Sequence, residues 1–254
     1  MPSRDDVVGS LRTLGIRAPA DALLAMITHL TKSRASSVQC LEALVALERR
    51  ERNARNLERR TKTATLGAFK PLDRFDWNHP RSVDRALYEE ILELGFLSRG
   101  ENVLLRGQSG VGKSNLAQAL AHAALVKGHT VRFTTIAAAL ADLSCQESVP
   151  ALERRLRRYT RVDLLVLDEL GYLPCDGRSA DLLYNLISRR HEKRSTVVST
   201  NLAYKQWATV FPGAACVVAL VDRFAQHCHV IDIDADSWRN KEATERAARK
   251  KPRT

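Results

Sequence analysis

The sequence predicts an α/β protein in which helices flank a parallel sheet, preceded by a small all-helical domain. Three observations lead to this prediction. From Val83 onward, short apolar segments alternate with amphipathic ones, as strands buried between helices do. A glycine-rich segment at 107–112 joins one such strand to a helix. Before residue 63, apolar residues recur at helical spacing, and no glycine lies between Gly15 and Gly67.

The amino-terminal part, residues 1–62, predicts helices over 22–30 and 38–57, with Ser36 and Ser37 as candidate N-caps of the second. We interpret it as a domain that binds DNA or a partner. Residues 63–82 mix glycine and proline with Phe69, Phe75 and Trp77. This segment, called the strap below, is too aromatic for a free linker, so we expect it to pack on the next domain.

The main domain is predicted to span residues 83–238, followed by a basic tail at 239–254 that lacks core residues and is expected to fray. In chain order the pattern predicts a helix at 83–95, a strand at 102–106, a helix at 113–127, a strand at 131–134, helices within 137–161, a strand at 164–167, a helix at 179–191, a strand at 196–200, helices at 204–209 and 218–226, and a strand at 230–233.

Charge and composition narrow the class of protein. Forty Lys and Arg residues against 29 Asp and Glu leave a net charge of +11, which favours a nucleic-acid partner. No apolar run approaches the about 18 residues of a membrane span, and no apolar signal core follows Met1, so we expect a cytoplasmic protein without membrane contact. Five scattered cysteines, odd in number and without a C-x-x-C pair, indicate buried thiols in a reducing compartment.

A phosphate-binding loop is the strongest motif. Residues 107–114, Gly-Gln-Ser-Gly-Val-Gly-Lys-Ser, match G-x-x-x-x-G-K-[ST] between a predicted strand and a predicted helix. Backbone amides of such a loop surround phosphate oxygens, Lys113 supplies a cation for the β- and γ-phosphates, and Ser114 supplies a hydroxyl for Mg²⁺. The predicted nucleotide-binding residues are Gly107, Gln108, Ser109, Gly110, Val111, Gly112, Lys113, Ser114 and Asn115.

A second motif supplies carboxylates. Leu164 to Glu169 form a buried strand that ends in two carboxylates, Asp168 and Glu169, which is the form of a Walker B segment. Asp168 is predicted to hold Mg²⁺ together with Ser114, and Glu169 to polarise the attacking water. The guanine-reading motif N-K-x-D is absent, since the nearest match at 240–243 lacks the aspartate. ATP is therefore the predicted nucleotide, and hydrolysis coupled to a conformational change suits the basic chain better than a small-molecule kinase.

Several further segments follow in a familiar order: 72–77 in the strap, 168–174, Ser-Thr-Asn at 199–201, Val-Asp-Arg at 221–223 and Ser-Trp-Arg at 237–239. From about Leu47 to Arg239 the chain resembles the IstB/DnaC-like helper ATPases of the AAA+ superfamily, and IstB transposition proteins more closely than DnaC-type loaders. The resemblance implies a P-loop AAA+ core, a sensor-1 role for Asn201, and an arginine-finger role for Arg223 in a homo-oligomer. Arg239 has two interpretations, a sensor-2 residue or a surface arginine, because little chain follows it to form a helical lid.

Two sets of basic residues are candidate DNA contacts through backbone phosphates. The first shares one face of the amino-terminal helix: Arg52, Arg55, Arg59 and Lys62. Its alternative interpretation is a solvated face balanced by Glu51 and Glu58. The second comprises Arg154, Arg158 and Arg161, which lie opposite a predicted core stripe of Leu152, Leu156 and Tyr159. The histidines of His227-Cys228-His229 lack further ligands at metal spacing and indicate packing.

Together, residues and resemblance predict an ATP-hydrolysing protein that oligomerises on double-stranded DNA and assists an IstA-like transposase. Two alternatives stay open. A replicative helicase loader of the DnaC type would share the nucleotide site and differ in the partner of residues 1–60. A non-enzymatic scaffold switched by ATP could dispense with Glu169, Asn201 and Arg223.

Overall fold

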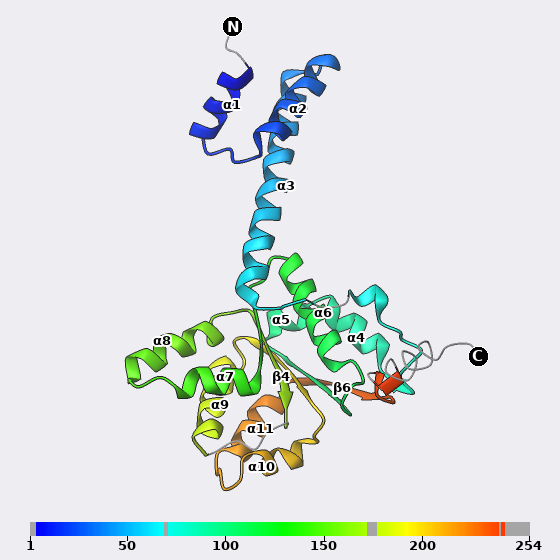
Figure 1. Cartoon of the computed structure of the whole chain (residues 1–254), viewed down its shortest axis with the longest axis vertical. Coiled ribbons are helices and arrows are strands. Elements are labelled where there is room, and N and C mark those ends of the chain that lie inside the picture. Colours follow the sequence, from blue (N-terminus) through cyan, green and yellow to red (C-terminus); the bar gives the residue numbers. More distant parts are fainter. Residues whose placement is uncertain (1–3, 69–70, 172–176, 239, 242–254) are drawn as a thin grey trace, which may run out of the picture. The chain divides into compact units, whose positions relative to one another are not determined.

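The computed structural model describes residues 4–68, 71–171, 177–238 and 240–241. By its internal contacts the chain divides into two compact units, Met1–Arg60 and Thr61–Thr254, and Figure 1 labels the elements of both. Arg239, Cys175 and the predicted basic tail beyond Lys241 lie outside the described residues.

The amino-terminal unit contains α1 (Arg4–Thr13), α2 (Ala20–Lys32) and most of α3 (Ser37–Ala64). Its core is formed by Val8, Ala18 and Leu23, against which Leu44 and Leu47 of α3 pack. The N-cap expected at Ser36 is confirmed, because its hydroxyl accepts the Gln39 amide while the Gln39 side chain accepts the amide of Ser36.

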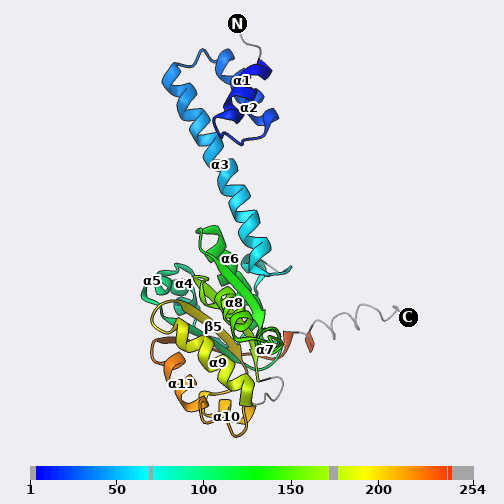
Figure 2. The ribbon, with the colours of Figure 1, turned by 90° about the vertical axis from the view of Figure 1, so that its left-hand side faces the viewer.

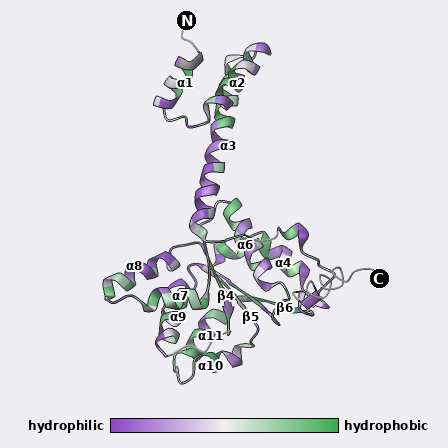
Figure 3. Cartoon of the chain, viewed as in Figure 1, coloured by the Kyte–Doolittle hydropathy of each residue, from purple (hydrophilic) through white to green (hydrophobic). Residues whose placement is uncertain are grey.

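Two features of these helices differ from the prediction. The sequence did not indicate α1, because this segment carries Gly9 and few apolar residues, and its Val8 finds a buried environment only in the packed unit. Helix α3 runs past 57 to Ala64, since no glycine or proline interrupts that mostly charged stretch. Figure 3 shows how hydrophilic α3 is along its middle.

The second unit is built on a six-stranded sheet in the order β1-β6-β2-β5-β4-β3. The strands are β1 (Ser82–Val83), β2 (Asn102–Gly107), β3 (Val131–Thr135), β4 (Leu164–Leu170), β5 (Ser195–Thr200) and β6 (Cys228–Asp234). Neighbouring strands are parallel, except that β1 is antiparallel to β6. The predicted parallel sheet is confirmed. Strand β1 was not predicted, because two residues show no periodicity.

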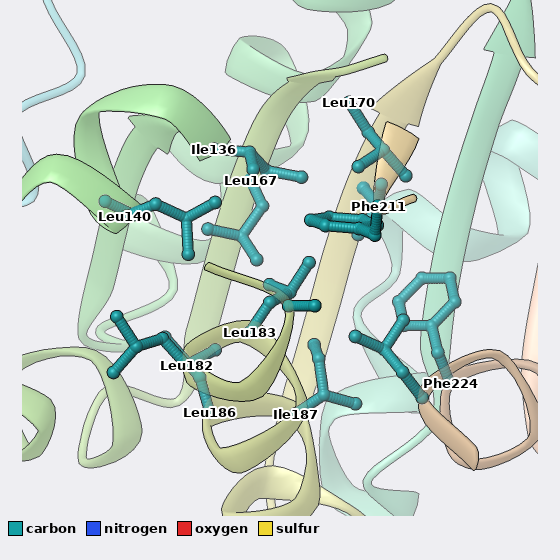
Figure 4. Close-up of a cluster of buried hydrophobic side chains, with 14 of the residues drawn as sticks. Ile136, Leu140, Leu167, Leu170, Leu182, Leu183, Leu186, Ile187, Phe211 and Phe224 are labelled. Atoms are coloured by element: carbon teal, nitrogen blue, oxygen red, sulfur yellow. The ribbon is translucent and has the colours of Figure 1, made fainter. Parts of the chain in front are cut away.

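Helices cover both faces of this sheet: α4 (Arg85–Leu92), α5 (Gly95–Arg99), α6 (Lys113–Val126), α7 (Ile136–Ser144), α8 (Val149–Thr160), α9 (Gly177–Arg190), α10 (Trp207–Val210) and α11 (Val217–Ala225). A large cluster of buried side chains from α7 to α11 packs on one face of β4 and β5, and Figure 4 shows part of it. Figure 2 shows the ribbon of these helices. Helix α6 packs on the strands and against α4. The single helix expected at 83–95 is two helices, because Leu94 adopts φ +64°.

Other expectations can be compared with the described residues. The four described cysteines are free, but Cys145 is exposed and the other three are partly exposed, so the prediction of buried thiols was wrong for these positions. No helix in the described ranges is long and apolar enough to cross a membrane. His229 pairs with Glu101 at 2.9 Å, whereas His227 lies 3.7 Å from Glu192, and the described residues contain no cluster suited to a metal ion.

Candidate nucleotide-binding site

The glycine-rich loop joins the carboxyl end of β2 to α6, and close approaches explain its glycines. Gly110 and Gly112 have φ of +83° and +98°, a region in which a side chain is strained. A Cβ at Gly107 would lie 2.4 Å from the carbonyl oxygen of Ile233, and one at Gly112 would lie 2.7 Å from the ring of Phe75. The loop therefore fits against β6 and the strap only with glycine at these positions.

Lys113, the first residue of α6, is 6% exposed. Its ammonium donates hydrogen bonds to the carbonyl oxygens of Gly107 and Gln108, at 2.8 and 2.6 Å. A buried cation is thus held over a loop at the positive end of a 14-residue helix. This arrangement fits a polyphosphate, whose oxygens can replace the two carbonyls as partners of the ammonium.

A cavity of about 330 Å³ opens beside this loop. Of the nine predicted nucleotide-binding residues, those from Gly110 to Asn115 line it, and Glu169 lies in the same lining. Gly107 and Gln108 contribute through the carbonyl groups that hold Lys113. The sequence assigned no nucleotide contact to the remaining lining residues, although all except His79 lie in segments that carry the resemblance: Arg74, Phe75, Asp76 and His79 from the strap, Ser199, and Trp238.

Asp168 and Glu169 lie near the carboxyl end of β4, as predicted, and the strand continues one residue further to Leu170. The pairing of β4 with β5 is irregular between Leu167 and Leu170, and Glu169 has φ +66°. Such a bulge re-aims side chains at the edge of an active site. It explains how Glu169 lines the cavity while the flanking Leu167 and Leu170 stay in the core.

Ser199 is a site residue that sequence reasoning missed. It lies on β5, between the strand that precedes the phosphate loop and the strand that carries the carboxylates. Its hydroxyl donates to Oδ1 of Asp168 and accepts the backbone N–H of Glu169 at 3.0 Å. A hydroxyl-bearing residue in a fully buried strand, next to Val197 and Val198, was the available signal.

The two residues assigned through the resemblance lie elsewhere. Asn201 follows β5, is exposed, and does not line the cavity. Arg223 lies on α11, where its guanidinium carbon is 5.0 Å from the ring centroid of Tyr184 on α9. Arg223 is likewise absent from the lining of this chain's own cavity. The sensor and finger roles stay predictions.

The basic face of α3 is partly occupied by internal contacts. Glu48 is buried and accepts the backbone N–H groups of Arg17 and Ala18, each at 2.8 Å. Arg52 and Arg55 form ion pairs with Glu48 at 3.2 and 3.3 Å. Burial by itself raises the pKa of Glu48, but these backbone and arginine hydrogen bonds outweigh it and lower the pKa below its ordinary value. Arg52 and Arg55 therefore stabilise the amino-terminal unit.

The second basic set is arranged differently. Arg154, Arg158 and Arg161 are exposed, whereas Leu156 and Tyr159 are buried, so the predicted core stripe of α8 is confirmed. Two arginines that the sequence did not indicate complete a pocket here. Arg157 lies on the same helix, and the guanidinium carbon of Arg132 on β3 is 4.6 Å from the ring centroid of Tyr159. None of the residues lining this pocket is acidic: Thr63, Val131, Arg132, Arg154, Arg157, Arg158, Arg161 and Val162.

The phosphate loop follows β2, the carboxylate pair lies on β4, and β5 lies between these two strands. This arrangement defines a P-loop nucleotide-binding protein. The chain belongs to the family of IstB-like ATP-binding proteins, whose family model matches residues 9–246. This family agrees with the resemblance seen in the sequence, which is thereby confirmed.

Individual relatives agree with this assignment. The chain is 36% identical over 186 residues to the insertion sequence IS21 putative ATP-binding protein of Pseudomonas aeruginosa, a match that covers 73% of this chain and 70% of the relative. It is 37% identical to the IS232 putative ATP-binding protein of Bacillus thuringiensis, covering 70% and 72%. Among solved structures, DnaI shares the fold with a TM-score of 0.53, at 22% identity over 66% of this chain and 92% of DnaI.

Proposed function

We propose that this protein is an ATPase that oligomerises on duplex DNA in the cytoplasm and assists an IstA-like transposase. The observation that carries the proposal is the cavity in which Lys113, Ser114 and Glu169 meet, with Asp168 held beside it by Ser199. A protein that only binds ATP does not need a carboxylate aimed into the cavity. The strained backbone of Glu169 supports a catalytic role for this residue.

The chemistry follows from the positions of these groups. When bound, Mg²⁺ neutralises charge on the β- and γ-phosphates, and the Ser114 hydroxyl and the Asp168 carboxylate are its candidate ligands. The Lys113 ammonium exchanges its two loop carbonyls for phosphate oxygens. Glu169 accepts a proton from the attacking water. Asn201 helps to position that water, and Arg223 of a neighbouring subunit neutralises developing charge.

DNA binding and partnership rest on other observations. The net charge of +11 and the arginine pocket on α8 support contact with backbone phosphates. The names of the relatives place them in insertion sequences, which supports a transposase as partner. Likeness in fold to the DnaC helicase loader, with a TM-score of 0.51, supports a second candidate, a helicase loader. Binding assays with the purified transposase of the same element and with a replicative helicase distinguish the two.

Replacing Glu169 by Gln tests the enzymatic part of the proposal. The amide keeps the size of the side chain but cannot accept a proton, so we expect ATP binding within about twofold of wild type and a loss of turnover on the order of 100-fold or more. Calorimetric titration measures the first quantity and phosphate release the second. Lys113→Ala is the matched comparison, since it should abolish binding itself. Unchanged turnover in Glu169→Gln would overturn the role of Glu169, and negligible turnover in wild type would leave the scaffold interpretation.

A further inference from the structure

Part of the cavity lining is aromatic, a feature to which neither the phosphate loop nor the carboxylate pair assigns a role. Phe75 and His79 of the strap and Trp238 near the carboxyl end line the same cavity as the phosphate loop. The rings of His79 and Trp238 are edge-to-face, with centroids 4.8 Å apart and an interplanar angle of 88°. Aromatic faces next to a phosphate site are suited to the base of a nucleotide.

These rings are fixed to the phosphate loop itself. The backbone N–H of Trp238 donates to the carbonyl oxygen of Gly110 at 3.0 Å. The ring of Phe75 occupies the space that a side chain at Gly112 would need. The aromatic residues are therefore held directly beside the phosphate loop, where one nucleotide can contact both.

His79 has a defined tautomer. Its Nε2 lies 2.8 Å from the backbone carbonyl oxygen of Asp236. A carbonyl oxygen only accepts hydrogen bonds, so Nε2 carries the hydrogen and Nδ1 of the neutral ring is an acceptor. The segment around Asp236 is itself held, because Arg81 donates its backbone N–H to Asp234 and its guanidinium to Asp236, at 2.7 and 2.6 Å.

We propose that Phe75, His79 and Trp238 form a base subsite, and that His79 Nδ1 selects purines with an amino group at position 6. An acceptor stabilises the 6-amino donor of adenine and repels the 6-oxo oxygen of hypoxanthine and guanine. Asp76 also lines the cavity, but its Oδ1 already accepts the amide of Asn78 at 3.1 Å. This inference rests on the proposed function and adds the residue that determines nucleotide choice.

Calorimetric titration of the full chain with ATP and with inosine triphosphate tests the proposal, because the two bases differ around position 6 alone. We expect wild type to bind ATP on the order of tenfold more tightly than inosine triphosphate, because only the 6-amino group of ATP can donate a hydrogen bond to His79. In His79→Phe the aromatic ring is kept but it has no nitrogen, so the Nδ1 acceptor is lost and the two affinities should become equal within about twofold. His29→Phe, at an exposed site in the amino-terminal unit, should keep the wild-type ratio.

A second variant separates selection from stacking. Trp238→Ala should weaken ATP and inosine triphosphate by the same factor, about fivefold or more, since any purine can stack on the ring. The proposal is overturned if wild type does not discriminate, if His79→Phe keeps the wild-type ratio of the two affinities, or if Trp238→Ala binds both nucleotides as wild type does. Failure of Lys113→Ala to weaken either nucleotide would instead overturn the proposed function.

Discussion

At the residue scale, the hydroxyl of Ser199 contacts both acidic residues of the site. It donates to the side chain of Asp168 and accepts the backbone N–H of Glu169, the residue with left-handed backbone. The first contact restrains a carboxylate that is 5% exposed, and the second fixes the peptide that aims the Glu169 side chain. Ser199 is therefore a positioning residue, which acts through its two neighbours.

Replacing Ser199 by Ala removes both contacts without filling the cavity. Because Glu169 loses a restraint while Lys113 and the loop are untouched, we expect kcat to fall on the order of tenfold and the Kd for ATP to change less than about twofold. Ser199→Thr keeps the hydroxyl on a β-branched residue suited to a strand, and it should restore most of the rate. Equal rates in the Ala variant and wild type would show that Ser199 only packs.

Sequence reasoning found the residues whose signal is local. The phosphate loop and the carboxylate pair are short motifs, and their spacing along the chain is enough to identify them. His79 and Trp238 could not be found this way, because they meet only where β1 pairs with the last strand. That pairing places Ser82 opposite Asp234, and it brings two segments far apart in sequence to one cavity.

At the element scale, strands and helices with a strong apolar pattern were predicted well. The two faces of α8 illustrate this, since Leu156 and Tyr159 are buried and Arg154 and Arg158 are exposed. The same reasoning could not foresee that Arg52 and Arg55 on α3 are engaged by Glu48. The sequence of a charged helix face does not distinguish whether that face contacts solvent, DNA or a buried carboxylate. For α3 the outcome depends on the packing of the loop before α2, whose backbone N–H groups bind Glu48.

Because the arginines of α8 are exposed whereas Arg52 and Arg55 of α3 pair with Glu48, we predict that α8 contributes more to DNA binding than α3 does. Reversing Arg154 and Arg158 to Glu should weaken binding to unrelated duplexes alike, about tenfold or more near physiological salt, and reduce the slope of log affinity against log salt by roughly 1 to 2. Fluorescence anisotropy at several salt concentrations measures both. Lys193 and Lys205 are exposed on other parts of the same unit, and reversing both makes an equal change in net charge.

The control pair decides how this result is interpreted. If Lys193→Glu with Lys205→Glu lowers affinity as much as the α8 pair does, only the overall charge matters and α8 is not the contact. Reversing Arg55 is a less informative experiment, because a glutamate there would face Glu48 and destabilise the amino-terminal unit. Loss of DNA binding in that variant must be compared with its thermal unfolding.

At the scale of the whole molecule, the proposed arginine finger, Arg223, lies apart from the cavity of its own chain. Arg223 lies on α11 over Tyr184 and does not line the cavity of its own chain. A site completed by the arginine of a second protomer works only where two protomers meet. ATPase activity should then rise more than linearly with protein concentration and rise further when duplex DNA gathers the subunits.

Mixing two inactive variants tests this arrangement. Arg223→Ala should bind ATP within about twofold of wild type yet lose turnover on the order of 100-fold, because its own phosphate loop is intact and its neighbours supply no guanidinium. Lys113→Ala cannot bind ATP but still presents Arg223. When the two are combined, phosphate release should return at the interfaces where an intact loop meets an intact arginine. Tyr184→Leu is the matched control, since it removes the ring contact and leaves Arg223 in place. If Tyr184→Leu alone is as inactive as Arg223→Ala, or if the mixture stays inactive although both variants fold and associate, Arg223 acts within its own subunit by packing on α9.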